Sequence, residues 1–127
     1  MAGLKRDPIK HVRDRAKSRY NKGTECEICG SQENLDFHHY YSMTEMLDKW
    51  LKKKRYPSST DEEVLAFRDE FIAEHEYEIF EATVTLCHHH HHTGLHGVYG
   101  KSPNLGTAKK QMNWVRIQKE KHSSGMV

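Results

Sequence analysis

The chain has 127 residues, of which 30% are charged and 35% hydrophobic, and this balance predicts one soluble domain with a small core. No apolar run approaches the roughly 20 residues that a membrane-spanning helix needs, so we expect no membrane association. Residues 1–7 carry charges without an apolar stretch behind them, which argues against a secretory signal. Three cysteines beside 11 histidines indicate metal ligands in a reducing compartment such as the cytoplasm, rather than a disulfide framework.

The formal net charge of +2 conceals an uneven distribution along the chain. Residues 1–22 hold eight Lys or Arg against two acids, and residues 87–127 hold six against one. Residues 23–86 hold six Lys or Arg against fifteen acids. Basic ends around an acidic middle are typical of a protein whose termini contact a polyanion, so we expect nucleic-acid binding. The alternative is that the Lys and Arg side chains only solvate helix faces.

The predicted elements of the first half begin with a helix at Asp7-Pro8, since Asp caps free N–H groups and Pro is tolerated in the first turn. Its apolar stripe consists of Ile9, Val12, Ala16 and Tyr20. Residues 24–41 predict a tight cysteine-containing turn and then a strand over 35–38. An apolar stripe from Met43 to Trp50 predicts a second helix, which ends before Pro57.

The second half begins with a capping-box pattern at residues 60–63, which predicts a third helix with Val64, Phe67 and Phe71 facing inward. A short strand over 83–86 leads into Cys87, and a helix is expected to follow through His96. Residues 100–106 predict a loop. Thr107 opens a last helix, with Ala108, Met112 and Val115 inward.

Two cysteine-containing turns predict a structural zinc site. Cys26 and Cys29 have C-x-x-C spacing, and Cys87 with His90 repeats the same spacing about sixty residues later. Two ligand pairs on two turns complete a tetrahedral zinc site, and the zinc would brace a small domain. His91 is the alternative fourth ligand. The competing interpretation is a metal-free or redox-active thiol pair, which the absence of a thioredoxin-like strand–helix pattern around it weakens.

Further histidines suggest a second metal site. His38 and His39 end a predicted strand, whereas His92 and His96 are four residues apart and so share one face of an α-helix. A neutral imidazole can take a proton from water at neutral pH, and imidazoles can hold a divalent ion that stabilises a phosphoryl group. All-imidazole ligation suits Zn²⁺, Ni²⁺, Co²⁺ or Mn²⁺ better than Mg²⁺.

Three features of the chain together resemble an HNH endonuclease with a ββα-metal core, of the zinc-knuckle, phage-encoded type. They are the two cysteine turns, Phe37-His38-His39 and His92-x-x-x-His96. The resemblance covers residues 24–100, with a helical insertion over 43–80. It implies that His38, His92 and His96 bind the catalytic ion and that His39 is the general base. It also implies that Cys26, Cys29, Cys87 and His90 bind zinc, and that Mg²⁺ or Mn²⁺ can be the working ion.

Two positions depart from the family pattern. Ala82 replaces the Asn that helps to hold the loop of the general base, so a backbone carbonyl or another side chain would have to orient His39. The spacing from Cys87 to His96 is one residue longer than usual. His91 is therefore an alternative to His92 at the catalytic ion, as well as to His90 at the zinc.

We therefore expect an α+β fold: one domain over residues 1–127, with a zinc-braced ββα-metal core, a basic N-terminal segment over 1–22 and a basic C-terminal helix over 107–122. The expected function is metal-dependent hydrolysis of DNA, by nicking or double-strand cutting, with a structural Zn²⁺ and one catalytic Mg²⁺, Mn²⁺, Ni²⁺ or Zn²⁺. Phosphate contacts are expected from Lys10, Arg13, Lys17, Lys101, Lys109, Lys110 and Arg116.

The alternatives are a non-catalytic zinc-stabilised nucleic-acid-binding module derived from such a nuclease, and an interaction protein acting through its acidic helix. The sequence does not indicate an oligomeric state.

Overall fold

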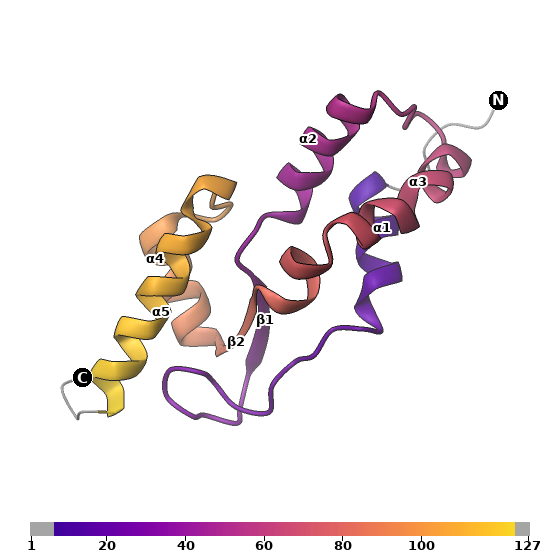
Figure 1. Ribbon diagram of the computed structural model, residues 1–127. Coiled ribbons are helices and arrows are strands. Elements are labelled where there is room, and N and C mark those ends of the chain that lie inside the picture. The colour runs from indigo at the N-terminus through magenta and orange to yellow at the C-terminus, as the bar shows by residue number, and fades with distance from the viewer. Residues whose placement is uncertain (1–6, 124–127) are drawn as a thin grey trace.

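The computed structural model describes residues 7–123 and shows helices packed on both sides of a two-stranded sheet (Figure 1). Residues 1–6 of the expected basic segment lie outside the described range. The elements in chain order are α1 (Pro8–Lys17), β1 (Leu35–His39), α2 (Met43–Lys54), α3 (Asp61–Glu74), η1 (Tyr77–Glu81), β2 (Thr83–Cys87), η2 (His89–Leu95), α4 (His96–Tyr99), η3 (Leu105–Thr107) and α5 (Ala108–Ser123). This mixture confirms the α+β class. The short elements η1 and η2 are π-helical, and η3 is a 3₁₀ turn.

The two strands connect segments that are distant in the chain. β1 and β2 are antiparallel, with Leu35 opposite Cys87 and His39 opposite Thr83. Because successive side chains of a strand point to opposite faces, His38 and His39 face different halves of the molecule. Helices α4 and α5 lie on one side of the sheet and α1 to α3 on the other (Figure 1).

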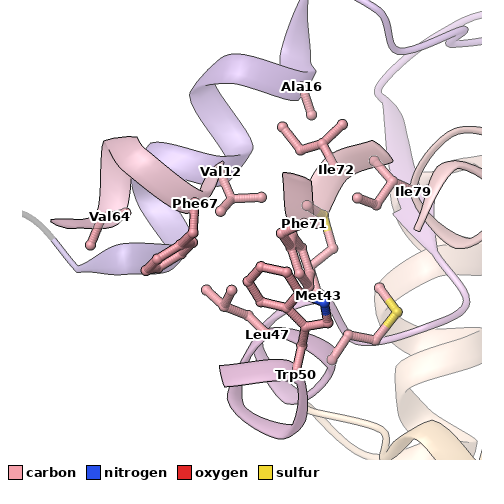
Figure 2. Close-up of a cluster of buried hydrophobic side chains, with 11 residues drawn as sticks. Val12, Ala16, Met43, Leu47, Trp50, Val64, Phe67, Phe71, Ile72 and Ile79 are labelled. Atoms are coloured by element: carbon pink, nitrogen blue, oxygen red, sulfur yellow. The ribbon is translucent and has the colours of Figure 1, made fainter. Parts of the chain in front are cut away.

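The larger core is formed by α1, α2, α3 and η1 (Figure 2). Trp50 of α2 packs edge-on against Phe67 and Phe71 of α3, with ring centroids 5.7 and 5.3 Å apart. Phe71 is completely buried, as is Val12 of α1. The apolar stripes predicted from helical spacing are therefore the faces that the three helices bury against one another.

Helix α3 begins with the predicted capping box. The Thr60 hydroxyl accepts from the Glu63 backbone N–H at 3.2 Å, and the Glu63 carboxylate accepts from the Thr60 N–H at 3.0 Å. The acidic α3–η1 region then pairs with the basic α1 region, through Arg15 to Asp69 at 3.3 Å and through Arg19 to Glu76 at 2.8 Å. Both pairs are exposed, so they neutralise charge but contribute little to the free energy of unfolding.

A second core lies beneath the cysteine turns. It contains the completely buried Leu86 and Leu95 together with Ala108 and Val115 of α5. Met112, which we also expected to face inward, is half-buried against the same cluster. This smaller core holds α5 against β2 and η2, and it includes the three cysteines. No helix within residues 7–123 is long and apolar enough to cross a membrane.

The burial of Phe71 leads to a prediction for stability. Phe71→Ala removes a completely buried ring and leaves a cavity, so we expect unfolding free energy to fall by about 3–5 kcal/mol. Leu65→Ala on the same helix is the control, because Leu65 is 45% exposed and should cost much less. Urea denaturation followed by circular dichroism measures both; equal losses would contradict the packing described here.

Candidate metal centres and active site

Three sulfurs and one imidazole converge where β2 meets the first cysteine turn. The ligand atoms of Cys26, Cys29, Cys87 and His90 all lie within 4.8 Å of one another. The Cys29 and Cys87 sulfurs are 3.9 Å apart, and His90 Nδ1 lies 3.3 Å from the Cys87 sulfur. Thiolates about 2.3 Å from a tetrahedral zinc stand about 3.8 Å apart, so this donor set is compatible with zinc.

The backbone of the first turn prepares this donor set. Gly30 adopts a φ of 75°, which favours glycine, and its N–H donates to the Cys26 carbonyl at 2.8 Å. Burial raises the pKa of the Cys26 thiol, but backbone hydrogen bonds to its sulfur outweigh this and lower the pKa overall. Burial and the neighbouring sulfurs raise the pKa of Cys29 to about 11. A bound cation would relieve this crowding of thiolates.

A second cluster contains only imidazoles. His38 Nδ1 lies 3.1 Å from His91 Nε2, which lies 3.1 Å from His96 Nε2. His38 comes from the end of β1, His91 from η2 and His96 from the start of α4. Ligands about 2.1 Å from one ion stand about 3.0 Å apart at a right angle and about 3.4 Å apart at the tetrahedral angle. The observed separations fit both geometries.

The outer nitrogen of each ring has a hydrogen-bond acceptor. His91 Nδ1–H donates to the Asp36 carboxylate at 3.1 Å, and His96 Nδ1–H donates to the Gly100 carbonyl at 2.7 Å. His38 Nε2–H donates to the amide oxygen of Gln111 at 2.8 Å. These acceptors assign the protons to the outer nitrogens and leave lone pairs on the three inner ones.

A chain of hydrogen bonds fixes the orientation of the Gln111 amide. The Thr107 hydroxyl donates to the Asn104 carbonyl at 2.7 Å, so it accepts from the Gln111 NH₂ group at 2.8 Å. The amide oxygen of Gln111 must then face His38. Gln111 is completely buried, and this chain satisfies both ends of its amide.

Three acceptor lone pairs facing one another cannot hydrogen-bond among themselves. A cation is the partner that suits this arrangement. Burial lowers the pKa of His38 to about 4, and burial also lowers the pKa of His91 although Asp36 opposes the shift. Both rings are therefore neutral at neutral pH and available as ligands.

The π-helical geometry of η2 explains why His91, and not His92, joins this cluster. Our sequence expectation of His92 assumed α-helical spacing, in which residues four apart share a face. In a π-helix the hydrogen bonds run from residue i to i+5, so His91 and His96 are the pair that align. The structure places the His92 ring outside the cluster, with Nε2 3.7 Å from the Asp36 carboxylate.

His39 lies on the opposite face of β1 from His38. Its Nε2–H donates to the Ile79 backbone carbonyl at 3.0 Å, and its ring packs edge-on against Phe37 and Tyr20. A backbone carbonyl from η1 thus orients His39. The bond places the proton on Nε2 and leaves the acceptor lone pair on Nδ1. Burial lowers the pKa of His39, the hydrogen bond to the Ile79 carbonyl opposes this shift, and the nearby Arg13 adds to the lowering.

A cleft of about 490 Å³ connects the imidazole cluster with His39. Arg13 of α1 and Lys101 after α4 line the same cleft. An adjoining hollow of about 680 Å³ shares Arg13 and His39, and is also lined by Lys17 and Lys22. Glu45 and Asp48 also line the first hollow and Asp14 lines the second, so basic side chains outnumber acidic ones only in the second.

The other basic residues predicted to contact phosphate lie away from the cleft lining. Lys10, Lys109 and Lys110 are exposed. Arg116 donates to Glu120 at 2.8 Å and to Asn113 at 2.6 Å. It lines a different hollow, near the C-terminal half of α5. The structure therefore brings Arg13, Lys17 and Lys101 near His39 and leaves the other four elsewhere.

Comparison with known proteins adds to this geometry. A family model of phage T5 nicking endonucleases matches residues 2–126, nearly the whole chain. The chain belongs to the Nicking endonuclease family. As a member of this phage family, the protein is a DNA endonuclease. No solved structure matches the chain.

Sequence reasoning missed two residues of the site in this nicking endonuclease. Asp36 and Gln111 hold His91 and His38, but neither has a spacing that marks it as part of a metal site. Asp36 precedes the His38-His39 pair by two residues on β1, which was the available signal. Gln111 stands on an otherwise apolar helix face between Ala108 and Val115, so an amide on the core stripe was a signal for a buried polar contact.

Gln111→Leu is expected to weaken binding of a divalent ion by the imidazole cluster by about 10–100-fold, because His38 Nε2–H loses its acceptor. Gln118→Leu on the same helix is the control and should leave affinity unchanged. Calorimetric titration of zinc-loaded protein with Ni²⁺ measures both. Equal affinities in the two variants would show that Gln111 does not position His38.

Proposed function

We propose that the protein is a metal-dependent nicking endonuclease of the HNH type. Its ββα-metal core would consist of β1, β2 and the helical segment η2–α4. The observation that carries this proposal is the convergence of three imidazole lone pairs, from His38, His91 and His96, in a cleft that also contains His39. The family match supports DNA as the substrate and a nick as the product.

His39 is the general base in this proposal. The Ile79 carbonyl accepts from Nε2–H, so the lone pair on Nδ1 is the proton acceptor. Burial keeps the ring neutral near pH 7, where it can accept a proton from water. The water oxygen bonds to phosphorus as its proton passes to His39, the bond from phosphorus to the 3′ oxygen breaks, and the departing 3′ oxygen takes a proton from solvent water. The ends formed are a 5′-phosphate and a 3′-hydroxyl.

His38, His91 and His96 would hold one divalent ion. Such an ion supplies positive charge for the phosphoryl oxygens and the departing 3′ oxygen when it is bound. Imidazole donors accept Zn²⁺, Ni²⁺ or Mn²⁺, and the resemblance to HNH enzymes adds Mg²⁺. Asp36, Gln111 and the Gly100 carbonyl keep the three rings in the ligating tautomer.

The basic side chains that line the hollows beside His39 would form the surface that binds the DNA backbone. Arg13 and Lys101 reach phosphates in the cleft, and Lys17 extends the contact into the adjoining hollow. Such contacts position the strand without reading its sequence. With His39 as the general base, the cleft would cut one strand at a time, which fits nicking. Arg15 and Arg19 are paired with acidic residues and are not part of this surface.

We further propose that Cys26, Cys29, Cys87 and His90 hold a structural zinc. The zinc would tie the first cysteine turn to the end of β2, and thereby support the strand that carries His38 and His39. Reduced cysteines suit a phage protein that acts in the host cytoplasm.

His39→Ala is expected to lower plasmid nicking by about 10²–10⁴-fold, because the attacking water loses its proton acceptor. His122→Ala, at an exposed position on α5, is the matched control. The assay follows conversion of supercoiled plasmid to the open circle in Mg²⁺, Mn²⁺, Ni²⁺ or Zn²⁺. DNA binding without nicking in every ion would overturn the proposal and favour a non-catalytic binding module.

Cys29→Ser is expected to abolish binding of the structural zinc and to lower the melting temperature, since metal binding here is coupled to folding. Gln32→Ala, an exposed change just after the same turn, is the control. Elemental analysis after dialysis gives the zinc content, and calorimetry gives the melting temperature. A Cys29→Ser protein that keeps its zinc would refute this ligand set.

A further inference from the structure

A third group of potential metal ligands lies on the outer surface of η2. Asp36, His88 and His92 place one ligand atom each within 4.8 Å of one another. His88 Nδ1 is 3.3 Å from Asp36 Oδ2, and His92 Nε2 is 3.7 Å from the same oxygen. Neither histidine belongs to the cysteine cluster or to the imidazole cluster around His38.

The geometry of the pair suits a shared cation. His88 precedes η2 and His92 lies four residues later, with their rings stacked 4.1 Å apart at 29°. The side chains of His88 and His92 are 65% and 56% exposed, so an ion from solution can reach them without rearrangement of the core. Two imidazoles and a carboxylate form a donor set that zinc and nickel ions prefer.

We propose that Asp36, His88 and His92 form a peripheral site for a borderline transition-metal ion such as Zn²⁺ or Ni²⁺. Two exposed histidines and the partly exposed Asp36 leave the remaining coordination positions to water, so the ion binds more weakly than at the two buried clusters. Mg²⁺ is a poor occupant, because it prefers oxygen ligands in an octahedral arrangement.

Asp36 couples this peripheral site to the active site, an extension that rests on the proposed function. Its Oδ2 atom also accepts the His91 Nδ1–H at 3.1 Å. A cation bound to the same carboxylate withdraws electron density from it and so weakens its hydrogen bond to His91 Nδ1–H. That hydrogen bond holds His91 in its ligating tautomer. Filling the peripheral site would therefore loosen His91, and excess zinc would inhibit nicking.

Binding is tested independently of activity. Zinc-loaded protein is titrated with Ni²⁺, and the equivalents bound are counted by calorimetry and native mass spectrometry. We expect the unmodified protein to bind one weak equivalent of Ni²⁺ beyond the ions of the two buried clusters. His88→Ala should lose this equivalent. His89→Ala should retain it, because His89 is a neighbouring exposed histidine outside all three groups. Absence of the weak equivalent in the unmodified protein, or its persistence in His88→Ala, would overturn the site.

The coupling is tested by nicking in Mn²⁺ with increasing Zn²⁺. We expect His88→Ala to nick normally without added zinc and to need at least about tenfold more zinc for half inhibition, while His89→Ala follows the unmodified protein. Equal inhibition of all three would refute the coupling. If the unmodified protein nicks in no ion, the proposed function fails, and the binding titration still decides the peripheral site.

Discussion

The π-helical turn η2 is the constraint on which both buried candidate metal clusters depend. Within this turn His90 reaches the cysteine sulfurs, whereas the next residue, His91, reaches His38 and His96. Adjacent residues of a helix point in different directions, so one short segment can serve two ions. The wider turn places His91 in line with His96, five residues later. Insertions of this type occur often at functional sites.

Groups that are not themselves ligands hold the three rings of the imidazole cluster in place. Acceptors on three separate elements take the outer N–H groups: Asp36 on β1, the Gly100 carbonyl after α4, and Gln111 on α5. The C-terminal helix thus takes part in the site although it carries no ligand. Since the lone pairs already point inward, little reorganisation is needed for an ion to bind.

Charge is divided between the two faces of the N-terminal helix region. One face pairs with the acidic α3–η1 region, through Arg15 and Arg19, and the other directs Arg13 and Lys17 toward the hollows beside His39. The acidic middle of the sequence is therefore an internal partner of the basic N-terminus as well as a solvated surface. The basic residues left beside His39 suit a DNA backbone.

The sequence alone determined the helix stripes, the capping box, the two strands and the spacing of the cysteine turns, because each depends on residues close together in the chain. It also placed His38 and His39 at a strand end. Only the tertiary structure decided between His91 and His92, because the difference between α- and π-helical spacing depends on how η2 packs between β2 and α5. It likewise supplied Gln111 and the Ile79 carbonyl, since hydrogen bonds between residues 40 or more positions apart leave no periodic trace in a sequence.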